Sequence, residues 1–188
     1  MKELKKIKYW LFDLDNTLYS GETKVFDQVD KKMSSFISKK LNVDIEEARV
    51  IQKNYFHKYN TTLNGMLKNH NIDAEEFLEF VHDVNLDFLE KDLKLKNEIA
   101  KLNGKKFIFT NGSRSHANNV IKKYGLEPEY CIFIEDIARN LEPAFKLGMK
   151  TVWIKNNEPW AAEQSDSSFV HYQTENLSKF LGDINELK

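Results

Sequence analysis

Two aspartates, Asp13 and Asp15, stand one residue apart directly after the apolar run of residues 9–12. The residue types of that run suit a buried strand, and aspartates are poor strand formers, so the pair marks the end of the strand. In open α/β sheets, ligands bind outside the carboxyl ends of the strands. A carboxylate in that position can bind Mg²⁺ through oxygen or attack phosphorus to form an aspartyl-phosphate.

A second polar group, Thr110-Asn111-Gly112, follows the apolar run of residues 105–109. The Thr110 hydroxyl and the backbone N–H groups of Asn111 and Gly112 could hold phosphate oxygens there. The start of a following helix would add further N–H donors. The alternative interpretation is an ordinary turn, because Asn-Gly is a common turn pair.

A third polar group, Glu135-Asp136, follows the apolar run of residues 131–134. By itself it could be a helix N-terminus, where acids favour the macrodipole, and Asp13 with Asp15 could be a solvated turn or helix cap. Polar groups on three successive strand ends instead favour phosphoryl transfer, which needs a nucleophile, a metal and donors for phosphate oxygens. In this hypothesis Asp13 is the nucleophile, and Asp15 protonates the leaving oxygen and later activates water. Asp136, with Glu135 as a candidate companion, would complete a Mg²⁺ site with Asp13 and the carbonyl of Asp15.

Short apolar runs alternate with helical sequence in the parts of the chain that carry these groups. This alternation predicts an α/β fold with a Rossmann-like parallel sheet and right-handed crossovers. The last helix is expected from Leu177 to Leu187, with Gly182 as a point where it could be interrupted. The polar stretch 156–168 is expected to be a surface loop. The expected strands cover residues 7–12, 105–109, 131–134, 151–154 and 169–174.

Residues 23–92 differ from the rest, since their apolar residues recur at helical spacing and they contain no proline. Asp44 and Asp73 each precede a glutamate at the capping-box position, which predicts two helix starts. A connection of this length between two strands needs its own core. We therefore expect a Rossmann-like core of residues 1–18 and 93–188 and an inserted all-helical domain of residues 19–92, which the family resemblance described below would make the core and the cap of a hydrolase.

Composition excludes several classes of function. Hydrophobic residues make up 41% and charged residues 30%, with a net charge of −1 and no basic stripe, so nucleic acid is not an expected partner. No apolar run approaches the roughly 20 residues that span a bilayer, and the charged residues 1–6 do not resemble a signal peptide. The single cysteine, Cys131, lies in an apolar run and is expected to be buried. The cytoplasm is the expected compartment.

The three polar groups together resemble motifs one, two and four of the haloacid dehalogenase-like superfamily. More narrowly, residues 59–65, 80–84 and 135–141 resemble the pyrimidine 5′-nucleotidase family. The resemblance implies an aspartate nucleophile, Mg²⁺, a helical cap that shuts water out of the site, and small phosphomonoesters such as UMP or CMP as substrates. Tyr19 and Thr62 are candidate neighbours of the substrate, with a core or helix-cap role as the alternative for each.

One motif of the superfamily has no counterpart in this chain. Relatives carry a lysine between motifs two and four that pairs with the phosphate and the nucleophile, whereas residues 121–126 here run directly into residues 127–130. A strand and helix, on the order of 40 residues with their loops, are missing. The lost strand is expected at an edge of the sheet, which would survive with a new exposed edge. Lys122 and Lys123 are the nearest replacements in sequence, unless they form a solvated helix end.

Three functions follow from these patterns. The first is a Mg²⁺-dependent phosphatase that acts on nucleoside monophosphates through an aspartyl-phosphate, as a pyrimidine 5′-nucleotidase. The second is a degenerate relative that binds Mg²⁺, phosphate or a protein partner with weak or no catalysis. The third, dehalogenation, attacks carbon without Mg²⁺ and leaves the acid-rich site unexplained. The sequence does not distinguish a monomer from a homodimer, and it does not predict which nucleobase the substrate carries.

Overall fold

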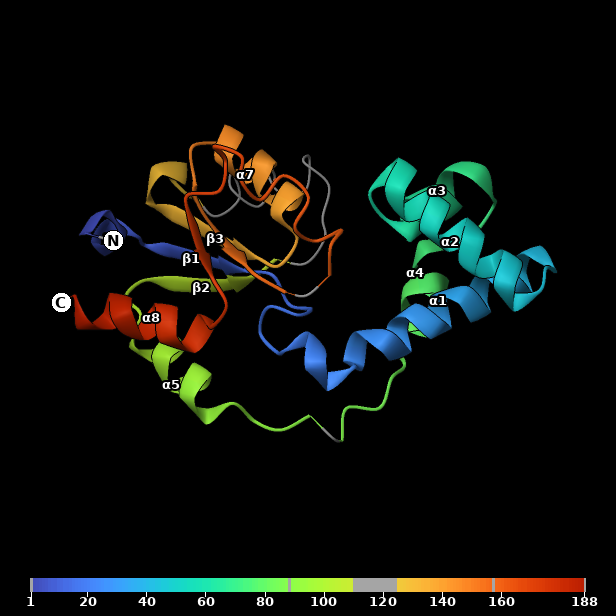
Figure 1. The fold of residues 1–188 in the computed structure, drawn as a ribbon, viewed down its shortest axis with the longest axis horizontal. Helices are drawn as coiled ribbons and strands as arrows, with labels where there is room; N and C mark the ends of the chain where they lie inside the picture. The colour runs from blue at the N-terminus through green and yellow to red at the C-terminus, as the bar shows by residue number, and fades with distance from the viewer. Residues whose placement is uncertain (1, 88, 110–124, 157, 188) are drawn as a thin grey trace. The chain divides into compact units, whose positions relative to one another are not determined.

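The computed structural model describes residues 2–87, 89–109, 125–156 and 158–187 (Figure 1). The chain divides into two compact units. Unit 1 consists of Met1–Gly21 and Lys91–Lys188, and unit 2 consists of Glu22–Glu90. Unit 2 is thus an insertion between two segments of unit 1. Its boundaries lie within three residues of those expected for the cap, whose function as a cap stays a prediction.

Unit 1 is built on a five-stranded sheet in which every neighbouring pair of strands is parallel, in the order β2-β1-β3-β4-β5. The predicted α/β fold with a parallel sheet is therefore confirmed. The strands are β1 (Tyr9–Phe12), β2 (Lys105–Ile108), β3 (Cys131–Glu135), β4 (Lys150–Ile154) and β5 (Tyr172–Thr174).

The last strand is shorter than the apolar pattern predicts. Before Tyr172, the backbone N–H of Val170 donates to the Ser167 carbonyl at 3.0 Å in a turn. The N–H of His171 donates to the Thr151 side-chain oxygen at 3.1 Å. These two N–H groups are satisfied outside the ladder, so the strand begins only afterwards.

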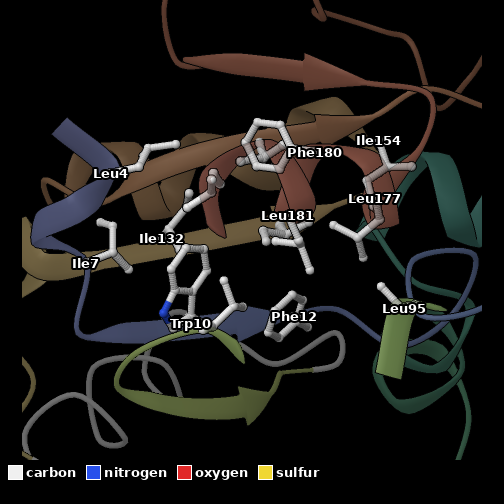
Figure 2. Close-up of a cluster of buried hydrophobic side chains, with 14 residues drawn as sticks. Leu4, Ile7, Trp10, Phe12, Leu95, Ile132, Ile154, Leu177, Phe180 and Leu181 are labelled. Carbon is white, nitrogen blue, oxygen red and sulfur yellow. The ribbon is translucent and has the colours of Figure 1, made fainter. Parts of the chain in front are cut away.

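The two faces of the sheet contribute to two separate apolar clusters, as expected for side chains that alternate along a strand. Trp10 and Phe12 of β1 point into the cluster drawn in Figure 2, whereas Leu11 between them belongs to the other. Helices α5 (Leu93–Lys101) and α8 (Leu177–Glu186) supply the first cluster. The short helices η4 (Ala138–Leu141) and α7 (Glu142–Lys146) supply the second. Unit 1 therefore has helices on both faces of its sheet.

Helix α8 runs without a break through Gly182, so the predicted interruption there is wrong. The Asn176 side chain caps the helix by accepting from the Lys179 N–H at 2.8 Å. Phe180, Leu181 and Ile184 bury one face of the helix against the sheet. This burial outweighs the small helix penalty of one glycine.

Strand β2 lies at one edge of the sheet. Among the described residues it pairs only with β1. Ile108 is 61% exposed, and Lys105 and Lys106 are exposed too. Lysines on an edge strand oppose pairing with further strands. The loss of a further edge strand stays a prediction, because residues 110–124, which follow β2, lie outside the described residues.

The described part of unit 2 contains four α-helices around a core of its own. The Asp44 carboxylate accepts from the Glu47 N–H at 2.8 Å, and the Asp73 carboxylate accepts from the Glu76 N–H at 2.9 Å, which confirms both predicted helix starts. The helices are α1 (Val25–Leu41), α2 (Ile45–Tyr59), α3 (Thr62–Asn69) and α4 (Ala74–His82). Their buried core is Val29, Phe36, Ile37, Ala48, Met66, Phe77 and Val81.

Short 3₁₀ helices complete the described chain. They are η1 (Lys2–Lys6), η2 (Gly21–Thr23) and η3 (Pro128–Tyr130). None of the helices in the described ranges is both long and apolar enough to cross a membrane.

Candidate active site

Asp13 occupies the last hydrogen-bonded position of the ladder between β1 and β3. Its backbone N–H donates to the Ile134 carbonyl at 2.9 Å, and the chain then turns, with the Leu18 N–H donating to the Leu14 carbonyl at 3.0 Å. Asn16 within this turn has φ 57°, a left-handed conformation that asparagine tolerates better than most residues. The strand therefore ends at Phe12, and the side chain of Asp13 lies at the carboxyl edge of the sheet.

Three carboxylates meet at this edge. In the parallel register Phe12 lies opposite Ile134. The next residue of each chain segment is therefore an acid, with Asp13 directly after β1 and Glu135 as the last residue of β3. One carboxylate oxygen each of Asp13, Glu135 and Asp136 lies within 4.8 Å of the other two. All three residues are buried, with at most 8% of their surface exposed.

This concentration of buried acid makes ionisation costly. Burial, with the neighbouring Asp136 carboxylate, raises the pKa of Asp13 to about 8. Burial and the same neighbour hold the pKa of Glu135 well above its usual range. Burial also raises the pKa of Asp136, to about 6. Among the described residues, no lysine or arginine forms an ion pair with these groups.

The cluster fits a divalent cation. Its donors are all carboxylate oxygens, the ligands that Mg²⁺ prefers. The buried side-chain oxygen of Asn16 next to the cluster has no hydrogen-bond partner among the described groups, although its side chain bonds to Asp136. A cation would offset the repulsion that raises the three pKa values.

Neutral donors hold two of the carboxylates. The Asn140 amide donates to one Glu135 oxygen at 2.6 Å, and the Ile137 N–H donates to the other. The Asn156 amide donates to Asp136 Oδ2 at 2.9 Å. Sequence reasoning did not single out either asparagine. Asn140 lies inside the segment that resembles the nucleotidase family, but nothing in the sequence around Asn156 pointed to the site.

Asp15 has a different environment from Asp13. It is half-buried, its carboxylate is not one of the three clustered groups, and the Tyr19 hydroxyl donates a hydrogen bond to its Oδ1. Burial and then this bond raise the pKa of Tyr19, which keeps the phenol protonated as the donor. Tyr19, left open above as a substrate neighbour, is therefore a partner of Asp15.

The remaining residues singled out from the sequence either lie away from the acidic cluster or are outside the described residues. Thr62 is buried in unit 2, where its hydroxyl donates to the Gln52 carbonyl at 3.4 Å, which favours the core role. Cys131 is buried and free, as predicted, and burial raises the pKa of its thiol to about 11, which opposes a nucleophilic role. Thr110, Asn111, Gly112, Lys122 and Lys123 all lie outside the described residues.

The chain is similar to a known protein family and to a curated protein. The model of a family described as haloacid dehalogenase-like hydrolase matches residues 7–143. Phosphate metabolism protein 8 of Saccharomyces cerevisiae is 32% identical over 129 residues, which cover 63% of this chain and 40% of that protein. The chain thus spans well under two thirds of the length of this curated relative.

Two solved structures have the same fold. A HAD phosphatase from Thermococcus onnurineus aligns with a TM-score of 0.56 at 17% identity, covering 95% of this chain and 98% of the other. A predicted phosphoglycolate phosphatase from Haemophilus somnus 129PT aligns with a TM-score of 0.57 at 13% identity and the same coverage of both chains. At these identities the likeness concerns the fold.

Proposed function

Because the chain belongs to the haloacid dehalogenase-like hydrolase family, we propose that it is a Mg²⁺-dependent phosphomonoester hydrolase with Asp13 as its nucleophile. The observation that carries this proposal is the convergence of Asp13, Glu135 and Asp136 at two adjacent strand ends. A hydrolase of carbon–halogen bonds would have no use for two further buried acids beside its nucleophile. Phosphoryl transfer uses a metal, which Asp136 would help to hold with Glu135 as its companion.

The proposed reaction has two steps. In the first, an Asp13 carboxylate oxygen attacks phosphorus, the bond from phosphorus to the leaving oxygen breaks, and Asp15 gives that oxygen a proton. In the second, Asp15 takes a proton from water, whose oxygen attacks the same phosphorus. The bond to Asp13 then breaks and releases phosphate. Mg²⁺ held by Asp13, Asp136 and the Asp15 carbonyl would offset the charge of the phosphate oxygens.

The proposed substrates are nucleoside monophosphates such as UMP or CMP. Support comes from residues 59–65 and 80–84, which resemble the pyrimidine 5′-nucleotidase family and belong to unit 2. In this proposal unit 2 is the cap that shields the site from water. The name of the yeast relative refers to phosphate metabolism and is compatible with this substrate class.

A second candidate function is binding of Mg²⁺ or phosphate without turnover. It is favoured by the absence of any ion pair between the acidic cluster and a described lysine or arginine. Loss of a cation aimed at the transferring phosphoryl group would slow the reaction by about 10²–10³-fold, by analogy with lost oxyanion donors. We therefore expect slow turnover from the phosphatase.

The test is phosphate release from UMP, CMP and an aryl phosphate with Mg²⁺ and with EDTA. We expect release that depends on Mg²⁺ and falls at least about 10³-fold in Asp13→Asn, because the amide cannot form the acyl-phosphate. Asp166→Asn is the matched control, since Asp166 is exposed in a loop of the same unit. An unchanged rate in Asp13→Asn would refute the nucleophile. No release from a broad panel of monophosphates would favour the binding function.

A further inference from the structure

Strand β4 and the loop that follows it each contact Asp136. At the end of β4, the buried Trp153 indole N–H donates to the backbone carbonyl of Asp136 at 2.8 Å. Two residues after the strand, the Asn156 amide donates to Asp136 Oδ2 at 2.9 Å and approaches its carbonyl at 3.4 Å. Both the main chain and the carboxylate of Asp136 are therefore held from a neighbouring strand.

The orientation of the Asn156 amide follows from its other bond. Its Oδ1 accepts from the Glu158 backbone N–H at 2.9 Å. A backbone N–H can only donate, so the amide oxygen must face Glu158 and the NH₂ group must face Asp136. The loop thus presents a donor, rather than an acceptor, to the carboxylate.

The Asn156 amide is uncharged, and this matters for metal binding by Asp136. A lysine or arginine at the same place would neutralise Asp136 and compete with a divalent cation for it. An amide donates a hydrogen bond to the carboxylate and leaves its negative charge in place, so the carboxylate can still bind a metal. Asn156 can therefore orient Asp136 without lowering its capacity to bind Mg²⁺.

We propose that Asn156 is a positioning residue that fixes the Asp136 carboxylate for Mg²⁺ binding. This inference rests on the proposed function, because it assumes that the acidic cluster binds the metal. Asn156 itself contacts neither the metal nor the substrate in this proposal. It acts by fixing the orientation of the Asp136 carboxylate.

The test is isothermal titration of the chain of residues 1–188 with MgCl₂, for the unaltered protein, Asn156→Ala and Asn97→Ala. Asn97 is an exposed asparagine of α5 in the same unit and serves as the matched control. We expect Asn156→Ala to weaken Mg²⁺ binding about tenfold, as outer partners of metal ligands typically do when removed. At saturating Mg²⁺ the rate of phosphate release should recover, with an unchanged KM for the phosphate ester. Asn97→Ala should match the unaltered protein in all three quantities.

Folding is checked by circular dichroism and by the melting temperature without metal. Asn156→Ser is the second variant, since it also removes the amide but leaves a polar side chain on the half-buried loop. Equal Mg²⁺ affinity of the unaltered protein and a folded Asn156 variant would overturn the inference while leaving the proposed function intact. Failure of both variants to fold would also overturn it, by showing a structural role. Absence of Mg²⁺ binding by the unaltered protein would overturn the metal site itself.

Discussion

Asp13 and Asp15 are two residues apart, yet their surroundings differ in kind. Asp13 is buried beside two other acids, and its pKa is raised to about 8. Asp15 is half-buried and accepts from the Tyr19 hydroxyl. In the proposed function, a bound cation would favour the ionised, nucleophilic form of Asp13, and Asp15 outside the cluster would be the acid–base group. The spacing of the aspartates predicted the pair, but Tyr19 is brought to Asp15 only by the left-handed turn at Asn16.

Tyr19→Phe tests the importance of this contact. The substitution removes only the hydroxyl, so Asp15 loses its donor and can adopt other orientations. We expect kcat for UMP to fall about tenfold with KM within about twofold, because proton transfer depends on the placement of the acid–base group. Tyr9→Phe, on β1 of the same unit, is the control and should leave kcat unchanged. Equal kcat for Tyr19→Phe and the unaltered protein would show that Asp15 needs no partner.

At the scale of elements, the parts of the fold that local sequence determines were predictable. The apolar runs of β1 and β3 and the caps at Asp44 and Asp73 depend on neighbouring residues. Asn156 could not be predicted, because its role depends on the return of the loop after β4 to the end of β3. The register of β1 and β3, which brings Asp13 beside Glu135, is likewise a property of the sheet.

Two helical glycines allow a matched test of helix packing. A Cβ at Gly65 in α3 would lie 2.3 Å from Cβ and Cγ of Tyr55 in α2. The Tyr55 ring is held at its far end by a 2.7 Å hydrogen bond between its hydroxyl and His70 Nε2, so it cannot move aside freely. A Cβ at Gly182 in α8 would meet only the Glu98 side chain, at 3.8 Å.

We expect Gly65→Ala to destabilise unit 2 by about 1–3 kcal/mol through overpacking. Gly182→Ala should stabilise α8 by up to about 1 kcal/mol, because alanine favours a helix more than glycine does. Thermal unfolding followed by far-ultraviolet circular dichroism measures both. Tryptophan fluorescence reports unit 1 alone, because Trp10, Trp153 and Trp160 all lie there. A Gly65→Ala protein as stable as the unaltered one would mean that α2 and α3 can separate at little cost.

At the scale of the whole molecule, positive and negative charge nearly balance, with 28 basic and 29 acidic residues. The balance does not extend to the acidic cluster, where three buried carboxylates have no ionic partner among the described residues. Sequence patterns predicted two of the three acids as metal ligands and named Glu135 as a companion. They could not predict the extent of burial. Burial makes ionisation of the three carboxylates costly, so a bound cation would stabilise unit 1.

This burial predicts a stability that depends jointly on pH and Mg²⁺. The folded-state pKa of Asp13, about 8, lies above its ordinary value, so the metal-free folded state holds a proton that the unfolded chain has already lost. The stability of the metal-free protein should therefore fall as the pH rises from the ordinary pKa of Asp13, 3.8, to its folded-state value of about 8. Mg²⁺ binds the ionised carboxylates and must displace these protons, so binding strengthens over the same window.

We expect a fixed Mg²⁺ concentration to raise the melting temperature more at pH 8 than at pH 6, the region bounded by the pKa values of Asp13 and Asp136. Thermal melts with Mg²⁺ and with EDTA at the two pH values measure this difference. Asp13→Asn removes the group with the higher of these two pKa values. In this variant the rise in melting temperature caused by Mg²⁺ should be smaller and should differ less between the two pH values. If Mg²⁺ raises the melting temperature of the unaltered protein equally at both pH values, or more at pH 6, the ion binds away from these carboxylates. The cluster would then be a set of protonated acids that stabilise the fold by hydrogen bonding.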